Sequence, residues 1–114
     1  MNNLAFVIAE QGGDLDLALT YAQRAKQKLP QSPEVADTLG WIYIKKRLTP
    51  NAIEIYNDLV AKQPANSTYR YHLGMALLQR GDKPQARKEL ETALRNKPSP
   101  VEAGKIKELL SKLG

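Results

Sequence analysis

The sequence contains no cysteine and a single histidine, His72. Without cysteine there is no disulfide framework, no thiolate zinc site and no cysteine nucleophile. Cysteine usage therefore does not indicate the redox compartment of the protein. One histidine also excludes the multi-histidine metal sites. We expect neither a metal site nor a cofactor.

Long hydrophobic runs are absent as well. The longest strictly apolar stretch runs from Leu4 to Ala9, which is too short to span a bilayer and lacks the basic start of a signal peptide. There is no glycine-rich phosphate loop, no H-E-x-x-H motif and no nucleophile motif, so we expect no enzymatic activity. With 42% apolar and 25% charged residues, the composition is that of a globular protein.

The net charge of +5 is concentrated in one half of the chain. Residues 1–57 carry six basic and six acidic side chains, whereas residues 58–114 carry eleven basic and six acidic ones. A basic half indicates either binding to nucleic acid or an anionic surface, or simply a solvated helical face. Acidic residues interrupt the basic ones, and only two tyrosines are available there for base stacking, so nucleic-acid binding is the less favoured interpretation.

Proline and glycine recur at a fixed period, which predicts an internal repeat. The repeated features lie 34 positions apart: Pro30, Pro64 and Pro98; Pro50 and Pro84; and the pairs Leu39-Gly40 and Leu73-Gly74. Alanines at 18, 52 and 86 fall into the same register. Proline cannot continue a helix interior, and the apolar residues between prolines recur at helical spacing. The chain is therefore expected to be a series of helix pairs.

This pattern resembles the tetratricopeptide repeat, whose signature is W-x2-L-G-x2-Y, then A-x3-F, then P. The second repeat contains Leu39-Gly40-x2-Tyr43, then Ala52-x3-Tyr56, then Pro64. The resemblance implies an all-α fold, a right-handed α-solenoid of about seven helices forming one domain over residues 1–114. The expected parts are an N-terminally truncated repeat at about 1–32, repeats at about 33–66 and 67–100, and a capping helix at about 100–113.

Signals for helix ends accompany the repeats. Asp14 and Asp82 are predicted N-caps, with Gln85 completing a capping box for Asp82, and Thr49 is the predicted cap before Pro50. Arg47 stands where the other repeats have Gly13 and Gly81. If that position requires φ > 0, Arg47 is strained. The alternative is a turn rebuilt around residues 48–50 that needs no glycine.

The two ends of the chain differ. At the C-terminal end Ile106, Leu109, Leu110 and Leu113 form one apolar face, which suits a helix that caps the array. The first helix, by contrast, lacks the early part of its pattern and has no polar cap before it. We therefore expect further repeats upstream in the parent protein, and self-association through the uncapped N-terminal edge is an alternative function.

The resemblance implies that the first helix of each repeat lines a concave groove that binds a peptide or helix of another protein. Phe6, Trp41 and Met75 occupy equivalent positions and predict a ladder of apolar anchors. The alternative is that Trp41 and Met75 pack mainly against neighbouring helices. The predicted groove residues are Phe6, Asp37, Thr38, Trp41, Ile44, Lys45, Tyr71, His72, Met75 and Gln79.

Two further implications of the resemblance concern the partner and the source. Chaperone-binding members of the family hold a terminal carboxylate with Lys, Arg and Asn, but the matching positions here are Asn2, Phe6, Thr38, Thr68 and His72. No such clamp is expected. The first two repeats are similar to the C-terminal repeats of long bacterial tetratricopeptide proteins, which favours a bacterial source and leaves cytoplasm and periplasm both open.

Overall fold

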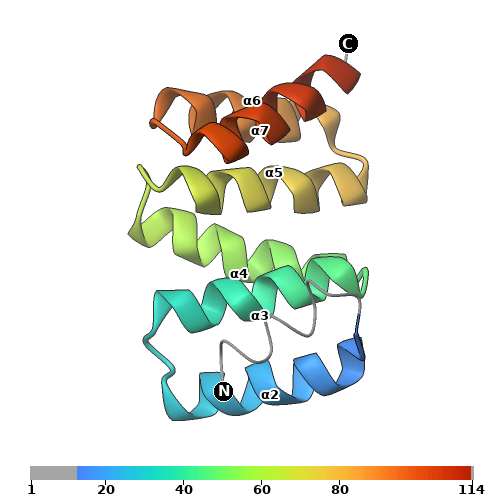
Figure 1. Ribbon diagram of the computed structural model, residues 1–114, viewed down its shortest axis with the longest axis vertical. Helices are drawn as coiled ribbons and strands as arrows, with labels where there is room; N and C mark the ends of the chain where they lie inside the picture. Colours follow the sequence, from blue (N-terminus) through green and yellow to red (C-terminus); the bar gives the residue numbers. More distant parts are fainter. Residues whose placement is uncertain (1–12, 114) are drawn as a thin grey trace. The chain divides into compact units, whose positions relative to one another are not determined.

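The computed structural model describes residues 13–113, and within them the chain forms six α-helices and no strand (Figure 1). The all-α fold expected from the repeats is confirmed. The predicted first helix falls in residues 1–12 and lies outside the described residues. The helices are α2 (Leu15–Lys28), α3 (Pro33–Lys45), α4 (Thr49–Lys62), α5 (Ser67–Arg80), α6 (Lys83–Arg95) and α7 (Pro100–Lys112).

The chain divides into two compact units, residues 1–55 and 56–114, and the boundary falls inside α4. In the first unit α2 packs against α3. Ala18 and Ala22 of α2 meet Leu39 and Ile42 of α3, and all four are buried. At the edge of this pair Lys46 forms an ion pair with Asp16.

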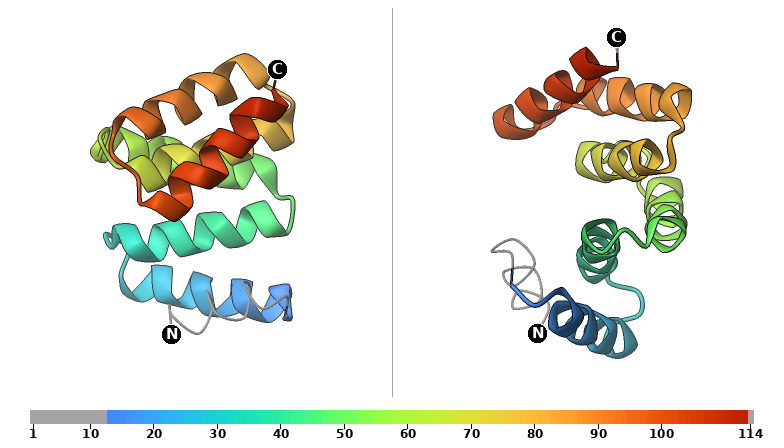
Figure 2. Two further views of the ribbon diagram at one scale, coloured as in Figure 1. Left: turned by 45° about the horizontal axis from the view of Figure 1, so that its top comes forward. Right: turned by 90° about the vertical axis from the view of Figure 1, so that its right-hand side faces the viewer.

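In the second unit α5, α6 and α7 lie close together (Figure 2), and their side chains share one core. Its buried members are Tyr71 of α5, Leu90 and Ala93 of α6, and Ile106 of α7. The predicted apolar face of the C-terminal helix is confirmed. The remaining members of that face are half-buried against this core: Leu109, Leu110 and Leu113.

Gly74 shows why the repeat contains a Leu-Gly pair. A Cβ atom placed on Gly74 would lie 2.8 Å from both Cγ and Cδ2 of Leu90. Leu90 is fully buried, so its side chain has little room to move. The glycine therefore allows α5 and α6 to approach closely, which compensates for its helix-propensity cost of about 1 kcal/mol.

The predicted helix caps are confirmed in part. Asp14 accepts hydrogen bonds from the backbone N–H groups of residues 16 and 17, and Asp82 accepts one from Gln85. The reciprocal half of the capping box is wrong, because the Asp82 N–H donates to Leu77 O instead. The predicted cap at Thr49 is also wrong. Thr49 is already the first residue of α4, and the preceding carbonyl, of residue 48, accepts from Ala52 N.

The turn after α3 has the same geometry as the turn after α5. Leu48 N donates to Tyr43 O at 2.9 Å and Arg47 N to Ile44 O at 3.0 Å, which is the Schellman arrangement. After α5 the equivalent bonds are Asp82 N to Leu77 O and Gly81 N to Leu78 O. The φ angle is +59° at Arg47 and +86° at Gly81. The expectation of a left-handed residue at position 47 is confirmed.

Candidate partner-binding surface

One face of α3 carries Asp37, Trp41 and Lys45, which are spaced four residues apart and so lie one above the other. The side chain of Trp41 is half-buried, Asp37 is half-buried and Lys45 is exposed. The ammonium nitrogen of Lys45 lies 5.0 Å from the centroid of the Trp41 ring, within the range of a cation–π contact. This contact places a positive charge beside the aromatic surface of Trp41.

Three of the predicted groove residues are buried. Thr38 is 7% exposed, and its hydroxyl donates to the backbone carbonyl of Glu34. Ile44 and Tyr71 are 4% and 7% exposed, and Tyr71 belongs to the core of the second unit. Helical spacing placed these side chains on the partner-facing stripe, but in the structure they contribute packing rather than open surface.

The equivalent face of α5 carries His72, Met75 and Gln79, all half-buried. The His72 ring contacts two tyrosines: its centroid lies 5.4 Å from that of Tyr56 and 5.3 Å from that of Tyr71. Met75 packs against the core formed by Tyr71, Leu90, Ala93 and Ile106. These side chains therefore support the helix packing and also leave part of their surface open. Phe6, the predicted first member of the ladder, lies outside the described residues.

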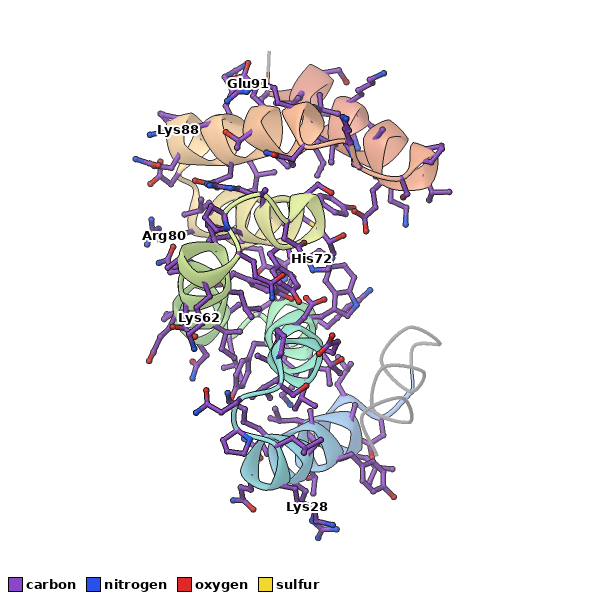
Figure 3. All side chains as sticks on the ribbon, turned by 90° about the vertical axis from the view of Figure 1, so that its left-hand side faces the viewer. Lys28, Lys62, His72, Arg80, Lys88 and Glu91 are labelled. Carbon is purple, nitrogen blue, oxygen red and sulfur yellow. The ribbon has the colours of Figure 1, made fainter. Side chains whose placement is uncertain are left out.

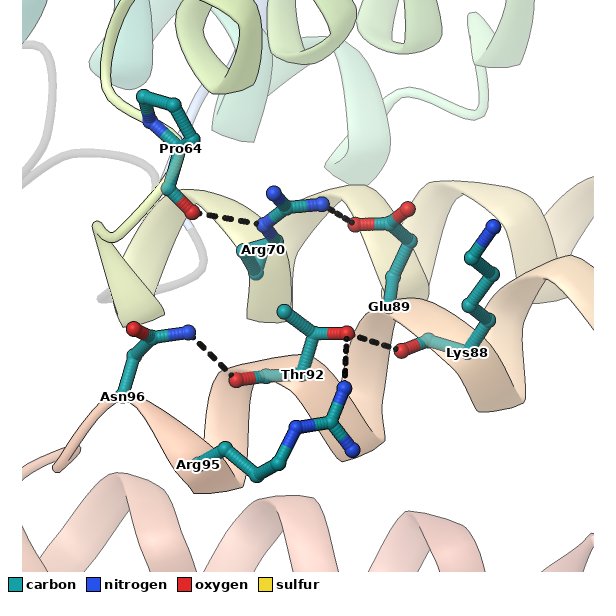
Figure 4. A network of polar contacts seen from close by, with 7 residues as sticks. All are labelled: Pro64, Arg70, Lys88, Glu89, Thr92, Arg95 and Asn96. Atoms are coloured by element: carbon teal, nitrogen blue, oxygen red, sulfur yellow. Dashed lines mark hydrogen bonds and ion pairs between the residues drawn. The ribbon is translucent and has the colours of Figure 1, made fainter.

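Sequence reasoning missed a polar network between α5 and α6 (Figure 4). Arg70 donates through Nε to Pro64 O at 2.9 Å and through Nη1 to the Glu89 carboxylate at 2.8 Å. The two charged side chains are only 20% and 12% exposed. The partners are 19 positions apart on different helices, so no local spacing rule could identify them. The ion pair holds the two helices of the third repeat together.

A second missed contact joins α5 to the C-terminal helix. The Thr68 hydroxyl lies 2.9 Å and 3.2 Å from the two carboxylate oxygens of Glu102 and donates to that carboxylate. The backbone N–H of Glu102 in turn donates to the hydroxyl oxygen of Ser99, the N-cap residue of α7. The N-terminal ends of α5 and α7 are thereby held side by side.

The basic half of the chain is partly neutralised by internal pairs. Arg70–Glu89, Arg80–Asp82, Lys62–Asp58 and Lys112–Glu108 are ion pairs. The basic residues are also interleaved with acidic ones on α6, where Lys88 and Glu91 are both exposed (Figure 3). Within residues 13–113 no group of three or more His, Asp or Glu side chains is arranged to hold a metal ion. No helix in that range is long and apolar enough to cross a membrane.

Comparison with known proteins agrees with the helix pairs described above. The solved structure of MamA AMB-1 superposes with a TM-score of 0.72 at 22% sequence identity, over 99% of this chain. The chain spans 62% of the length of that structure. This likeness concerns the fold. No curated protein sequence matches the chain.

A family model of the tetratricopeptide repeat matches residues 38–100, which is more than half of the chain. The match includes both Leu-Gly pairs that the period of 34 residues identified. It leaves out the first residues of the second repeat. Tetratricopeptide repeats are in general non-catalytic scaffolds for protein–protein interaction. The chain belongs to the tetratricopeptide repeat family.

Proposed function

We propose that the domain binds a peptide or helical segment of another protein, and that the partner-facing side of α3 and that of α5 each offer it a contact surface. The face of α3 supplies Asp37, Trp41 and Lys45, and the face of α5 supplies His72, Met75 and Gln79. The observation that carries the proposal is the half-buried Trp41 ring with Lys45 above it. Large aromatic side chains with part of their surface open are enriched among the anchors of protein interfaces.

The chemistry of this face suits a segment with apolar and polar groups in alternation. Trp41 and Met75 occupy equivalent positions in consecutive repeats and offer apolar surface. On α3, Asp37 and Lys45 place one acidic and one basic group beside Trp41, and on α5, Gln79 places an amide group beside Met75. Such a combination of apolar anchors and polar neighbours gives affinity through the anchors and selectivity through the rim.

Trp41 is the only tryptophan of the chain, so its fluorescence reports directly on the α3 face. Short peptides would be selected from a random displayed library on the intact protein, then titrated while tryptophan emission is recorded. We expect binding to shift the emission. In a second assay with labelled peptides, Trp41→Ala should weaken binding by at least about tenfold, the usual effect of removing an interface anchor.

The matched control is Leu17→Ala on α2, which also removes a partly open apolar side chain, 42% exposed. This variant should leave peptide affinity unchanged. Urea unfolding of both variants separates binding from stability. A Trp41→Ala variant that loses several kcal/mol of stability yet binds peptide normally would show that Trp41 serves the core, and the proposal would fail.

Two alternatives have their own tests. Binding of nucleic acid or an anionic surface by the basic half should weaken steeply between about 50 and 200 mM salt, because counterions compete for the basic side chains. Self-association through the N-terminal edge depends on residues 4 and 8, which lie outside the described residues. Sedimentation velocity as a function of protein concentration tests it directly.

A further inference from the structure

The C-terminal helix α7 has the same register as the first helix of a repeat. Its N-cap Ser99 accepts a hydrogen bond from the backbone N–H three residues later, as the N-cap Asn66 of α5 does. Seven residues after each cap stands a buried apolar side chain, Leu73 at 3% and Ile106 at 0% exposure. By this register Lys105 of α7 is the counterpart of His72 on α5.

Besides packing on α6, the helix α7 is joined to α5 by two side-chain contacts within the second unit. The Thr68–Glu102 hydrogen bond joins their N-terminal ends, and Tyr71 shares a core with Ile106. Because the register matches, the side of α5 that carries His72 is continued on α7 by the stripe of Val101 and Lys105. The partner-facing surface of the last repeat is therefore extended by one helix.

The α7 part of this surface is more open than the α5 part. Val101 is 68% exposed, although it is a branched apolar residue. A Cβ placed on Gly104 would have no neighbour within 4 Å. Lys105 is exposed and forms no hydrogen bond or ion pair with any residue in the range 13–113. The exposed apolar side chain of Val101, the uncrowded backbone at Gly104 and the unpaired ammonium group of Lys105 thus lie within about one helical turn.

Lys105 has no ion-pair partner within residues 13–113. Four of the six acidic side chains of residues 58–114 are ion-paired with other residues, and Glu102, which keeps its charge, accepts a hydrogen bond from Thr68. The sixth, Glu91, lies on α6. The same segment carries eleven basic side chains. Basic side chains therefore outnumber acidic ones in this segment, and an acidic group of a partner is the complementary occupant of the surface at Lys105.

We propose that α7 is part of the binding surface, and that the partner is a protein segment with an acidic side chain opposite Lys105 and an apolar side chain against Val101. The proposal rests on the proposed function, because it extends the face of α5 that was assigned to partner binding. It adds the chemical class of the partner. The contact differs from a terminal-carboxylate clamp in needing an internal acidic side chain and a single lysine.

Peptides selected from the random library on the intact protein provide the probe. Acidic residues next to an apolar residue should be enriched among them. Lys105→Glu should weaken binding of these peptides about fivefold or more, and Val101→Ser should weaken it as well. The control, Lys88→Glu on α6, makes the same change in net charge at another exposed lysine and should alter affinity by less than about twofold. Circular dichroism would verify that all three variants are folded.

Three results would overturn this inference. Selected peptides without acidic enrichment that respond to Trp41→Ala but not to Lys105→Glu would leave the proposed function standing and remove the role of α7. Equal weakening by Lys105→Glu and Lys88→Glu would show attraction by net charge alone. Binding of single-stranded oligothymidine through Lys105, with no peptide selected at all, would refute both proposals.

Discussion

Replacing Arg47 by glycine should stabilise the protein. Arg47 has φ = +59°, a left-handed conformation in which the Cβ atom crowds the following carbonyl oxygen. Gly81 occupies the same position of the same turn motif 34 residues later, with the same pair of hydrogen bonds. The substitution therefore converts one turn of the protein into a form that it already contains.

The expected magnitude is a balance of two terms. A left-handed conformation costs a non-glycine residue roughly 1–2 kcal/mol. Glycine gives up about 0.4–1 kcal/mol of this gain, because it makes the unfolded chain more flexible. The Arg47 side chain is exposed and has no hydrogen-bond or ion-pair partner in residues 13–113, so its loss adds no third term. The free energy of unfolding should rise by about 0.5–1 kcal/mol, and Tm by about 2–6 °C.

Urea denaturation followed by far-UV circular dichroism measures this difference, and calorimetry gives the change in Tm. Arg47→Ala is the matched control, because it removes the charge and the long side chain but keeps the Cβ atom that causes the strain. It should leave stability nearly unchanged. The reverse substitution, Gly81→Ala, should cost about 1 kcal/mol.

Two results would refute the reasoning. Arg47→Gly with an unchanged or lower midpoint would show that the turn tolerates a side chain at φ > 0 without cost. Arg47→Ala as stabilising as Arg47→Gly would show that charge or side-chain entropy matters and the backbone angle does not.

Three further predictions concern the second unit. Gly74→Ala should lower the free energy of unfolding by about 1–3 kcal/mol, because the new methyl group would overlap Leu90. Gly104→Ala, at an open helical position, should raise the free energy of unfolding by up to about 1 kcal/mol. Urea denaturation midpoints of the two variants compare these effects directly. Ile106→Ala should lower the free energy of unfolding by about 2–5 kcal/mol, because Ile106 is fully buried in the core that α7 shares with α5 and α6. A loss below about 1 kcal/mol in calorimetry would show that α7 does not share that core. Asp82→Ala should cost about 1 kcal/mol through the lost N-cap of α6, with Asp82→Asn as the control that retains an acceptor; equal losses in both variants would assign the effect to the Arg80 ion pair instead.

The repeat architecture could be predicted from sequence because it depends on local geometry. Leu39-Gly40 and Leu73-Gly74 recur because each repeat needs an apolar contact next to a close helix approach, and the approach at Gly74 is observed. Asp14 and Asp82 were identifiable as caps because an N-cap bonds to residues two or three positions away. The positive φ at Arg47 followed from its alignment with a glycine.

The candidate surface was predictable only in outline. Helical spacing grouped Asp37, Trp41 and Lys45 on one side of α3, but it could not separate half-open residues from buried ones. Ile44 of α3 and Tyr71 of α5 lie within the predicted stripes of their own helices and are buried, because the width of the contact with neighbouring helices decides how much of a stripe remains open. The Lys45–Trp41 contact depends on rotamers that spacing does not determine.

The sequence by itself determined the period, the helix pairs, the positions of the hinges and the family, since each of these is encoded by residues within one turn or one repeat. Only the tertiary structure decided which charges are neutralised. Arg70 with Glu89 and Thr68 with Glu102 pair across 19 and 34 positions, through helix contacts that leave no local signal. The same packing leaves Lys105 without a hydrogen-bond or ion-pair partner among the residues that the structure describes, 13–113. Electrostatic complementarity depends on distance in space, and folding sets that distance.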